Sequence, residues 1–108
     1  MHTKDEFKAR VREWAQKLEV DTRVISLRTM KRKWASYTQT SGLLIFNAAL
    51  LEMDESVKDY VIVHELLHIR IPNHGKLWKS FMRAYLGDYE QLERQLQQTK
   101  NLTGLGDL

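Results

Sequence analysis

The chain has 108 residues, a length that suits one domain with a single hydrophobic core. It contains no run of about 18 or more apolar residues, and its N-terminus is charged where a signal peptide would be apolar, so neither a membrane span nor export is expected. The net charge is +3 and there is no cysteine, so nothing requires an oxidising compartment. We expect a single cytoplasmic domain over residues 1–108.

The positive charge is concentrated in the N-terminal third of the chain. Lys and Arg outnumber Asp and Glu by ten to five in residues 1–36, whereas residues 37–108 carry seven basic and nine acidic residues. The densest basic stretch, Arg28 to Lys33, has the charge to contact phosphate, but no array of aromatic residues for stacking on bases lies beside it. We interpret it as a solvated loop and strand edge, and no nucleic-acid partner is expected.

The first helix and the sheet can be read from spacing and composition. Thr3 and Glu6 have the spacing of a capping box, and apolar residues then recur at helical intervals, which predicts a helix over residues 4–18. Three segments rich in β-branched and aromatic residues follow, and the turn residues Thr40-Ser41-Gly42 separate the last two. The predicted strands are residues 24–28, 33–38 and 43–47, which we expect to form a mainly antiparallel sheet.

Helices are predicted for the second half of the chain. Gly87 ends one of them, and Asp88 with Gln91 can cap the last. The expected elements are a helical turn at 48–52, helices at about 55–71 and 75–86, a last helix after Asp88, and a flexible tail over 101–108. The fold class is therefore α+β, with an N-terminal helix, a three-stranded sheet and C-terminal helices.

The segment His64-Glu65-Leu66-Leu67-His68 carries the clearest chemical signal in the chain. Four residues place His64 and His68 within about 40° on one helical face and one turn apart, which lets two imidazoles reach one ion. Glu65 points away from the line joining them by roughly a quarter turn. It is therefore placed as a base beside a metal site and not as a ligand.

A third histidine can reach the same ion if the helix stops after His68. Pro72 moves Ile71 out of helical geometry, and Asn73 tolerates the left-handed conformation that reverses a chain, so His74 can turn back toward the metal. Three imidazoles and a position left for water are typical of catalytic zinc. The alternative of three incidental core histidines is less favourable, because ionisable groups in an apolar helix are costly unless something satisfies them.

These motifs resemble those of the minigluzincins, the smallest soluble zinc metallopeptidases, and of the related YgjP-like metallopeptidase domains. The sequence departs from the pattern of YgjP-like domains at Ala35-Ser36-Tyr37-Thr38, where those domains usually carry Gly-Ser-Cys-Ser. No role of that cysteine therefore carries over. The longer relatives also have more sheet ahead of the motif. The segments that carry the resemblance are Met30-Lys31-Arg32-Lys33-Trp34, Gly42 to Asn47, Asp59 to His68, and Asn73-His74-Gly75 leading to Trp78.

The resemblance implies a small zincin-like domain that hydrolyses peptide bonds in a peptide or an unfolded protein. It implies Zn²⁺ as the cofactor, and it implies latency imposed by the C-terminal segment, through an extended tail or an exchanged last helix. Without the resemblance, a disordered end would be the preferred interpretation of the tail. The implied residues are His64, His68 and His74 as zinc ligands, Glu65 as general base and acid, and Asp107 with the terminal carboxylate of Leu108 as inhibitory groups.

Substrate binding is expected on a strand edge, since an extended peptide can add to an exposed strand through main-chain hydrogen bonds. The strand expected to have this edge consists of Leu43, Leu44, Ile45, Phe46 and Asn47. The oxyanion of the reaction needs a donor, and the sequence does not choose among the candidates. These are Tyr37, Tyr60, Tyr85 and Arg70.

Two other functions stay open from the sequence. The three histidines have the separations seen in YbeY, a bacterial family of ribosomal-RNA endonucleases, but glycine usually follows the first histidine there and Glu65 does here. The second alternative is a non-enzymatic, metal-stabilised domain that binds nucleic acid through its basic face. A general base beside an open metal position argues against it.

Overall fold

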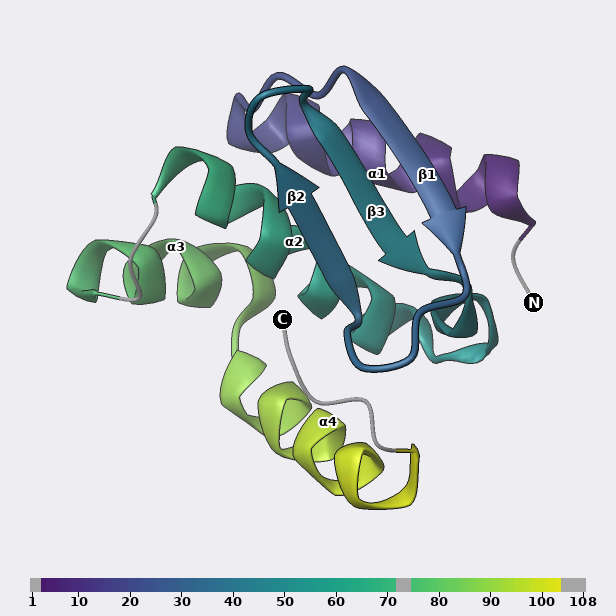
Figure 1. Ribbon diagram of the computed structural model, residues 1–108. Helices are drawn as coiled ribbons and strands as arrows, with labels where there is room; N and C mark the ends of the chain where they lie inside the picture. Colours follow the sequence, from purple (N-terminus) through teal and green to yellow (C-terminus); the bar gives the residue numbers. More distant parts are fainter. Residues whose placement is uncertain (1–2, 72–74, 104–108) are drawn as a thin grey trace.

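The computed structural model describes residues 3–71 and 75–103, which form four α-helices, a short 3₁₀ helix and one three-stranded sheet (Figure 1). The predicted α+β class and the order of the elements are confirmed. In chain order they are α1 (Lys4–Leu18), β1 (Val24–Arg28), β2 (Ala35–Thr38), β3 (Leu43–Asn47), η1 (Ala48–Glu52), α2 (Glu55–Arg70), α3 (Lys76–Leu86) and α4 (Tyr89–Thr103).

Helix α1 begins at the predicted capping box. The hydroxyl of Thr3 accepts a hydrogen bond from the Glu6 amide at 3.1 Å, and the Glu6 carboxylate accepts one from the Thr3 amide at 3.3 Å. The apolar stripe of α1 faces the sheet, where the ring of Phe7 packs edge-on against Phe46 of β3 at a centroid distance of 5.3 Å. This packing fixes α1 behind the sheet in Figure 1.

The sheet has the strand order β1-β3-β2, so β3 lies in the centre. The expectation that Leu43–Asn47 forms an exposed edge is therefore wrong, because both sides of β3 are hydrogen-bonded to neighbouring strands. The sheet is also mixed: β1 pairs with β3 in parallel, and only β2 pairs with β3 antiparallel, across the predicted turn. The edge that lies on the side of α2 and α3 in Figure 1 belongs to β2.

Helix α2 is held against α1 by one partly buried polar cluster. The Asp59 carboxylate accepts hydrogen bonds from the Arg10 guanidinium, one of them at 2.8 Å, and from the Trp14 indole at 2.8 Å. A bidentate, charge-assisted contact of this kind fixes direction as well as distance. The rotation of α2 about its own axis, which decides where its histidines point, is set partly by this cluster.

The ends of the C-terminal helices refine the sequence-based boundaries. Helix α2 ends at Arg70 and Ile71 is extended, with φ −127° and ψ 97°, as expected for a residue before Pro72. Helix α4 continues through Thr103, so the predicted tail does not begin at Asn101; the first glycine after the helix is Gly104. None of the helices in residues 3–71 and 75–103 is long and apolar enough to cross a membrane.

Candidate metal centre

His64 and His68 lie side by side on α2. Their ring centroids are 4.6 Å apart and the ring planes meet at 65°, which confirms that the four-residue spacing places both imidazoles on one face. His64 is buried and His68 is half-buried. Two imidazoles this close can supply two nitrogen ligands to one ion, so the donor set present here fits zinc.

Aromatic rings hold the two histidines in place. The indole of Trp78 on α3 packs edge-on against His64 at 5.0 Å and lies 6.0 Å from His68. One turn before His64 on α2, the ring of Tyr60 lies 5.7 Å from the His64 ring. In the sequence, Trp78 was identified only as the end of a motif shared with related domains. Its contact with both histidines depends on how α3 crosses α2, which no local pattern predicts.

Glu65 follows His64 directly on α2 and is buried. It is 6% exposed, and its Oε2 has no hydrogen-bond partner within the described part of the chain. Burial raises the pKa of the Glu65 carboxyl to about 6, although the positive charge of Lys33 opposes this rise. A buried carboxylate that is not held by a cation or by several donors is suited to exchanging a proton and less suited to stabilising the fold.

His74, the third expected ligand, lies outside the described residues, as do Pro72 and Asn73. Within the described ranges, no cluster of three or more His, Cys, Asp or Glu side chains that could hold a metal occurs. The structure therefore describes the arrangement of two of the three expected ligands, His64 and His68, and His74 stays a prediction.

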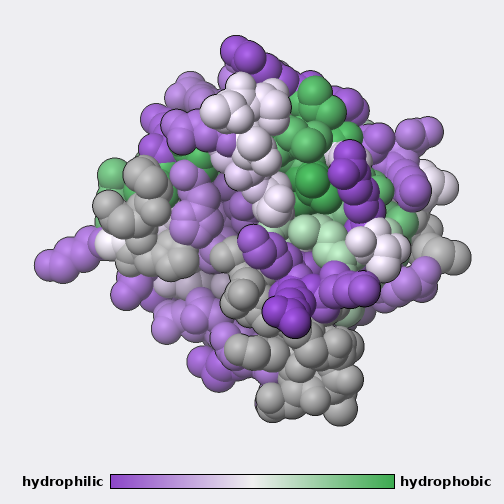
Figure 2. All heavy atoms as spheres, in the orientation of Figure 1, coloured by the Kyte–Doolittle hydropathy of each residue, from purple (hydrophilic) through white to green (hydrophobic). Residues whose placement is uncertain are grey.

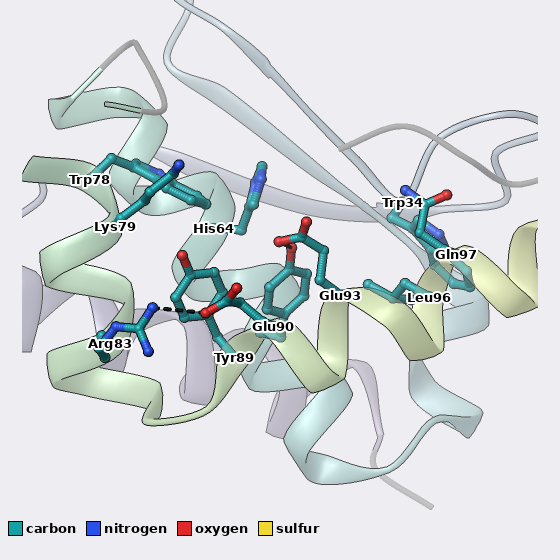
Figure 3. A pocket seen from close by; sticks show the side chains of 11 residues that line it. Trp34, His64, Trp78, Lys79, Arg83, Tyr89, Glu90, Glu93, Leu96 and Gln97 are labelled. Carbon is teal, nitrogen blue, oxygen red and sulfur yellow. Dashed lines mark hydrogen bonds and ion pairs between the residues drawn. The ribbon is translucent and has the colours of Figure 1, made fainter. Parts of the chain in front are cut away.

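A cleft of about 600 Å³ opens next to His64 (Figure 3). It lies between α2, α3 and α4, and the indole of Trp34, just before β2, closes one end. Most of its wall is aromatic or charged. The lining residues are Trp34, Tyr60, His64, Trp78, Lys79, Arg83, Tyr89, Glu90, Glu93, Leu96 and Gln97.

Helix α4 contributes two carboxylates to this cleft. The Tyr60 hydroxyl donates to Glu93 Oε2 at 3.4 Å, and in Figure 3 the Glu93 carboxylate points toward the space beside His64. On the next turn toward the N-terminus, Glu90 pairs with Arg83 of α3 at 2.8 Å. Burial and the charge of Glu93 both raise the pKa of Tyr60, so this hydroxyl stays protonated and can donate. The sequence predicted a last helix after Asp88, but these carboxylates were not recognised as part of a site.

The four candidate oxyanion donors lie in different parts of the structure. Arg70 donates to the main-chain oxygen of Leu18 at 2.8 Å, and the Tyr85 hydroxyl lies 3.5 Å from the main-chain oxygen of Lys17, so both side chains reach toward the end of α1. Tyr37 is half-buried in β2. Of the four, Tyr60 is the one that lines the cleft.

Comparison with known proteins identifies the class. The family model described as "YgjP-like, metallopeptidase domain" matches residues 1–99, so the chain belongs to the YgjP-like metallopeptidase domain family. The crystal structure of the metallopeptidase zymogen of Methanocaldococcus jannaschii jannalysin matches with a TM-score of 0.77 and 29% identity, over 86% of this chain and 95% of that one. The resemblance inferred from the motifs is thereby confirmed.

Two further relatives are similar. The crystal structure of the metallopeptidase zymogen of Pyrococcus abyssi abylysin has a TM-score of 0.77, with 94% of this chain and 99% of that chain covered; at 15% identity the match shows the fold alone. The uncharacterised protein MJ0123 of Methanocaldococcus jannaschii is 35% identical over 69 residues, which are 61% of this chain. The chain spans 63% of the length of that curated relative.

Proposed function

We propose that this protein is a zinc-dependent endopeptidase that acts on extended or unfolded polypeptides. The observation that carries the proposal is the arrangement on α2, where the rings of His64 and His68 lie 4.6 Å apart and the buried Glu65 follows His64 directly. Membership of a metallopeptidase domain family supports it. It also favours peptide hydrolysis over the RNA cleavage that the histidine spacing alone left open.

His64, His68 and His74 are the residues that would hold the metal. When bound there, Zn²⁺ would polarise the scissile carbonyl and make a water at the site more acidic. Glu65 takes a proton from the attacking water and delivers it to the leaving amine. Its pKa of about 6 supports both transfers near neutral pH, because the group can then accept a proton and also release it.

We propose that the substrate binds as an added strand on the edge of β2 and not on the central β3. Strand β2 has only β3 as a neighbour in the described sheet, so its outer main-chain groups can pair with an extended peptide. It also begins next to Trp34, which lines the cleft. Main-chain pairing gives affinity with little sequence preference, which suits an enzyme for unfolded protein.

Activity can be tested on two substrates in parallel. The full-length protein, loaded with one equivalent of zinc, is incubated with a denatured protein and with a structured RNA. We expect slow cleavage of the protein, loss of cleavage when a chelator removes the metal, and recovery when zinc is added back. Cleavage of the RNA in place of the protein would make the protein a nuclease.

We also propose that α4, which forms one wall of the cleft, keeps the enzyme latent by restricting the access of substrate to the site beside His64. The support is that five α4 residues line the cleft beside His64, and that the contacts Tyr60–Glu93 and Arg83–Glu90 join α4 to α2 and α3. Asp107 and Leu108, which the sequence suggested as inhibitory groups, lie outside the described residues. If the tail causes latency through those groups, its truncation should raise activity. If α4 causes latency through Glu90 and Glu93, substitution of these two residues should raise activity.

Three variants, compared with the full-length protein at equal zinc content, separate these forms of latency. The double substitution Glu90→Ala and Glu93→Ala removes the contacts with Arg83 and Tyr60, and we expect it to raise cleavage of a denatured protein several-fold. Arg94→Ala, an exposed change on the same helix, is the matched control. Truncation after Thr99 keeps the cleft-lining residues, so a rise in that variant alone assigns latency to the tail. Equal activity in all variants and the full-length protein would remove the latency proposal.

A further inference from the structure

Helices cover one face of the sheet, and within residues 3–71 and 75–103 the opposite face carries none (Figure 1). Side chains alternate along each strand, so the residues opposite the buried ones form cross-strand rows on the open face. The strand register gives these rows as Val24–Leu43–Thr38 and Ser26–Ile45–Ser36, and Arg28 lies one row further on, paired with the buried Asn47. We call Val24, Leu43 and Ile45 the outer stripe; Figure 2 shows hydrophobic side chains gathered over this part of the sheet.

The sequence of β3 is that of a strand covered on both faces. Leu43, Leu44, Ile45 and Phe46 form an unbroken apolar run, whereas a strand with one wet face alternates apolar and polar residues. Strand β3 also pairs in parallel with β1, and parallel pairs are normally buried on both sides. Yet Val24 is 51% exposed and Leu43 and Ile45 are only half-buried. The outer stripe therefore has the composition of an interface.

The segment that contains the sheet carries charge of a single sign. Residues 22–51, which contain the whole sheet, include five basic residues and no Asp or Glu. Arg28 lies in the last outward row, and the aliphatic part of Arg23 packs against Gly42, next to the Val24–Leu43 pair. A partner for this face should therefore carry negative charge.

The basic loop between β1 and β2 is fixed at one end of the stripe. The buried Asn47 side chain donates hydrogen bonds of 2.9 Å to the main-chain oxygens of Met30 and Lys33. Lys31 and Arg32, between these two anchors, are exposed. The two hydrogen bonds from Asn47 therefore hold the positive charges of this loop near the end of the outer stripe.

We propose that the outer stripe and its basic border form a docking surface for an acidic, amphipathic segment of another polypeptide. Its aliphatic side chains cover Val24, Leu43 and Ile45, and its carboxylates pair with Arg23, Arg28 and the basic loop. None of the stripe residues lines the cleft, so the proposal does not depend on peptidase activity.

Other occupants fit this surface less well. The outward rows contain no aromatic ring, so the face offers nothing on which nucleobases could stack. It also lacks the exposed Trp or Phe that anchors a protein in a lipid interface. A second copy docking through the same face would bring two basic borders together, which is unfavourable.

The test uses two synthetic 15-residue helical peptides. Both have leucine and valine on one face, and one carries glutamate and the other lysine on the flanks. Each is titrated by fluorescence anisotropy into full-length, zinc-loaded protein in the Glu65→Gln background, so that the peptide is not cleaved. We expect the glutamate peptide to bind at least about tenfold more tightly than the lysine peptide, with an affinity that falls as salt rises.

Substitutions on the surface should weaken binding of the glutamate peptide by about tenfold each. The variants are Val24→Asp and Arg28→Glu, with Val24→Thr as a milder change that keeps the β-branched shape. The matched controls are Leu77→Asp, an exposed leucine on α3, and Arg12→Glu, an exposed arginine on α1, which should leave affinity unchanged.

Three results would overturn the proposal. The first is equal binding of the two peptides, or no binding of either. The second is normal affinity in folded Val24→Asp and Val24→Thr proteins. The third is binding of phosphatidylglycerol vesicles or poly-uridine RNA in preference to the glutamate peptide, with loss of that binding in Arg28→Glu.

Discussion

Asp59 and Glu65 are two carboxylates on one helix, and their surroundings differ. Asp59 faces α1 and accepts hydrogen bonds from Arg10 and Trp14, so the carboxylate is satisfied and joins two helices. Glu65 follows His64 directly, is more deeply buried, and has an Oε2 without a hydrogen-bond partner among the described residues. Burial alone therefore does not mark a functional group, whereas burial that leaves a group incompletely satisfied does.

The largest expected effect tests whether Glu65 is a catalytic group. In the zinc-loaded protein, Glu65→Gln should lower peptide cleavage by at least about 100-fold, because the amide cannot accept the proton. The free energy of unfolding should not fall, since the substitution removes a buried charge and keeps the shape. Cleavage rates with a denatured protein and urea unfolding curves measure the two quantities.

Glu13→Gln on α1 is the control for this experiment, because it makes the same chemical change on an exposed residue. It should alter neither activity nor stability. If Glu65→Gln kept its activity, the base would have to be another group. If it unfolded instead, Glu65 would be a structural residue like Asp59.

The opposite outcome is expected for Asp59. Asp59→Ala should destabilise the protein by about 2 to 3 kcal/mol, because it leaves the partly buried Arg10 guanidinium and the Trp14 indole without their acceptor. A double-mutant cycle with Arg10→Ala measures the coupling between the pair, and a coupling energy near zero would show that the cluster does not fix α2.

A smaller effect should appear in the pH dependence of the metal-free protein. Burial raises the pKa of Glu65 from its ordinary value of 4.5 to about 6, so the folded state binds the proton more tightly than the unfolded state. The contribution to stability is therefore full below pH 4.5 and is lost as the pH rises through about 6. The loss amounts to about 2 kcal/mol.

Glutamine is neutral throughout this range, so metal-free Glu65→Gln should not show the loss. The difference in free energy of unfolding between the two proteins should grow from about pH 4 to about pH 7, as measured by urea unfolding. A constant difference would mean that the carboxyl of Glu65 has an ordinary pKa in the folded protein.

Local patterns predicted the elements well, because each depends on near neighbours in the chain. The capping box at Thr3 and the spacing of His64 and His68 are examples of features that need no long-range contact. The strand order was missed, since the turn at Gly42 indicates only that β2 and β3 are neighbours. The unbroken apolar run of Leu43–Phe46 was the signal for a central strand.

The walls of the site could not be predicted in the same way. Trp78 contacts both histidines, and Glu93 reaches Tyr60, only because α3 and α4 cross α2 at particular angles. These contacts join residues 10 to 33 positions apart, and no periodic pattern in the sequence encodes them. The extension of α4 to Thr103 is simpler, since the sequence has no glycine or proline between Gly87 and Gly104.

Zinc titration of three proteins separates the metal ligands from the general base. Competition with a chromophoric chelator gives the stoichiometry and affinity for the full-length protein, His74→Ala and Glu65→Gln. We predict one zinc per chain, an affinity at least about 100-fold weaker in His74→Ala, and little change in Glu65→Gln. Unchanged affinity in His74→Ala, or an equal loss in Glu65→Gln, would contradict a three-histidine site with Glu65 as its base.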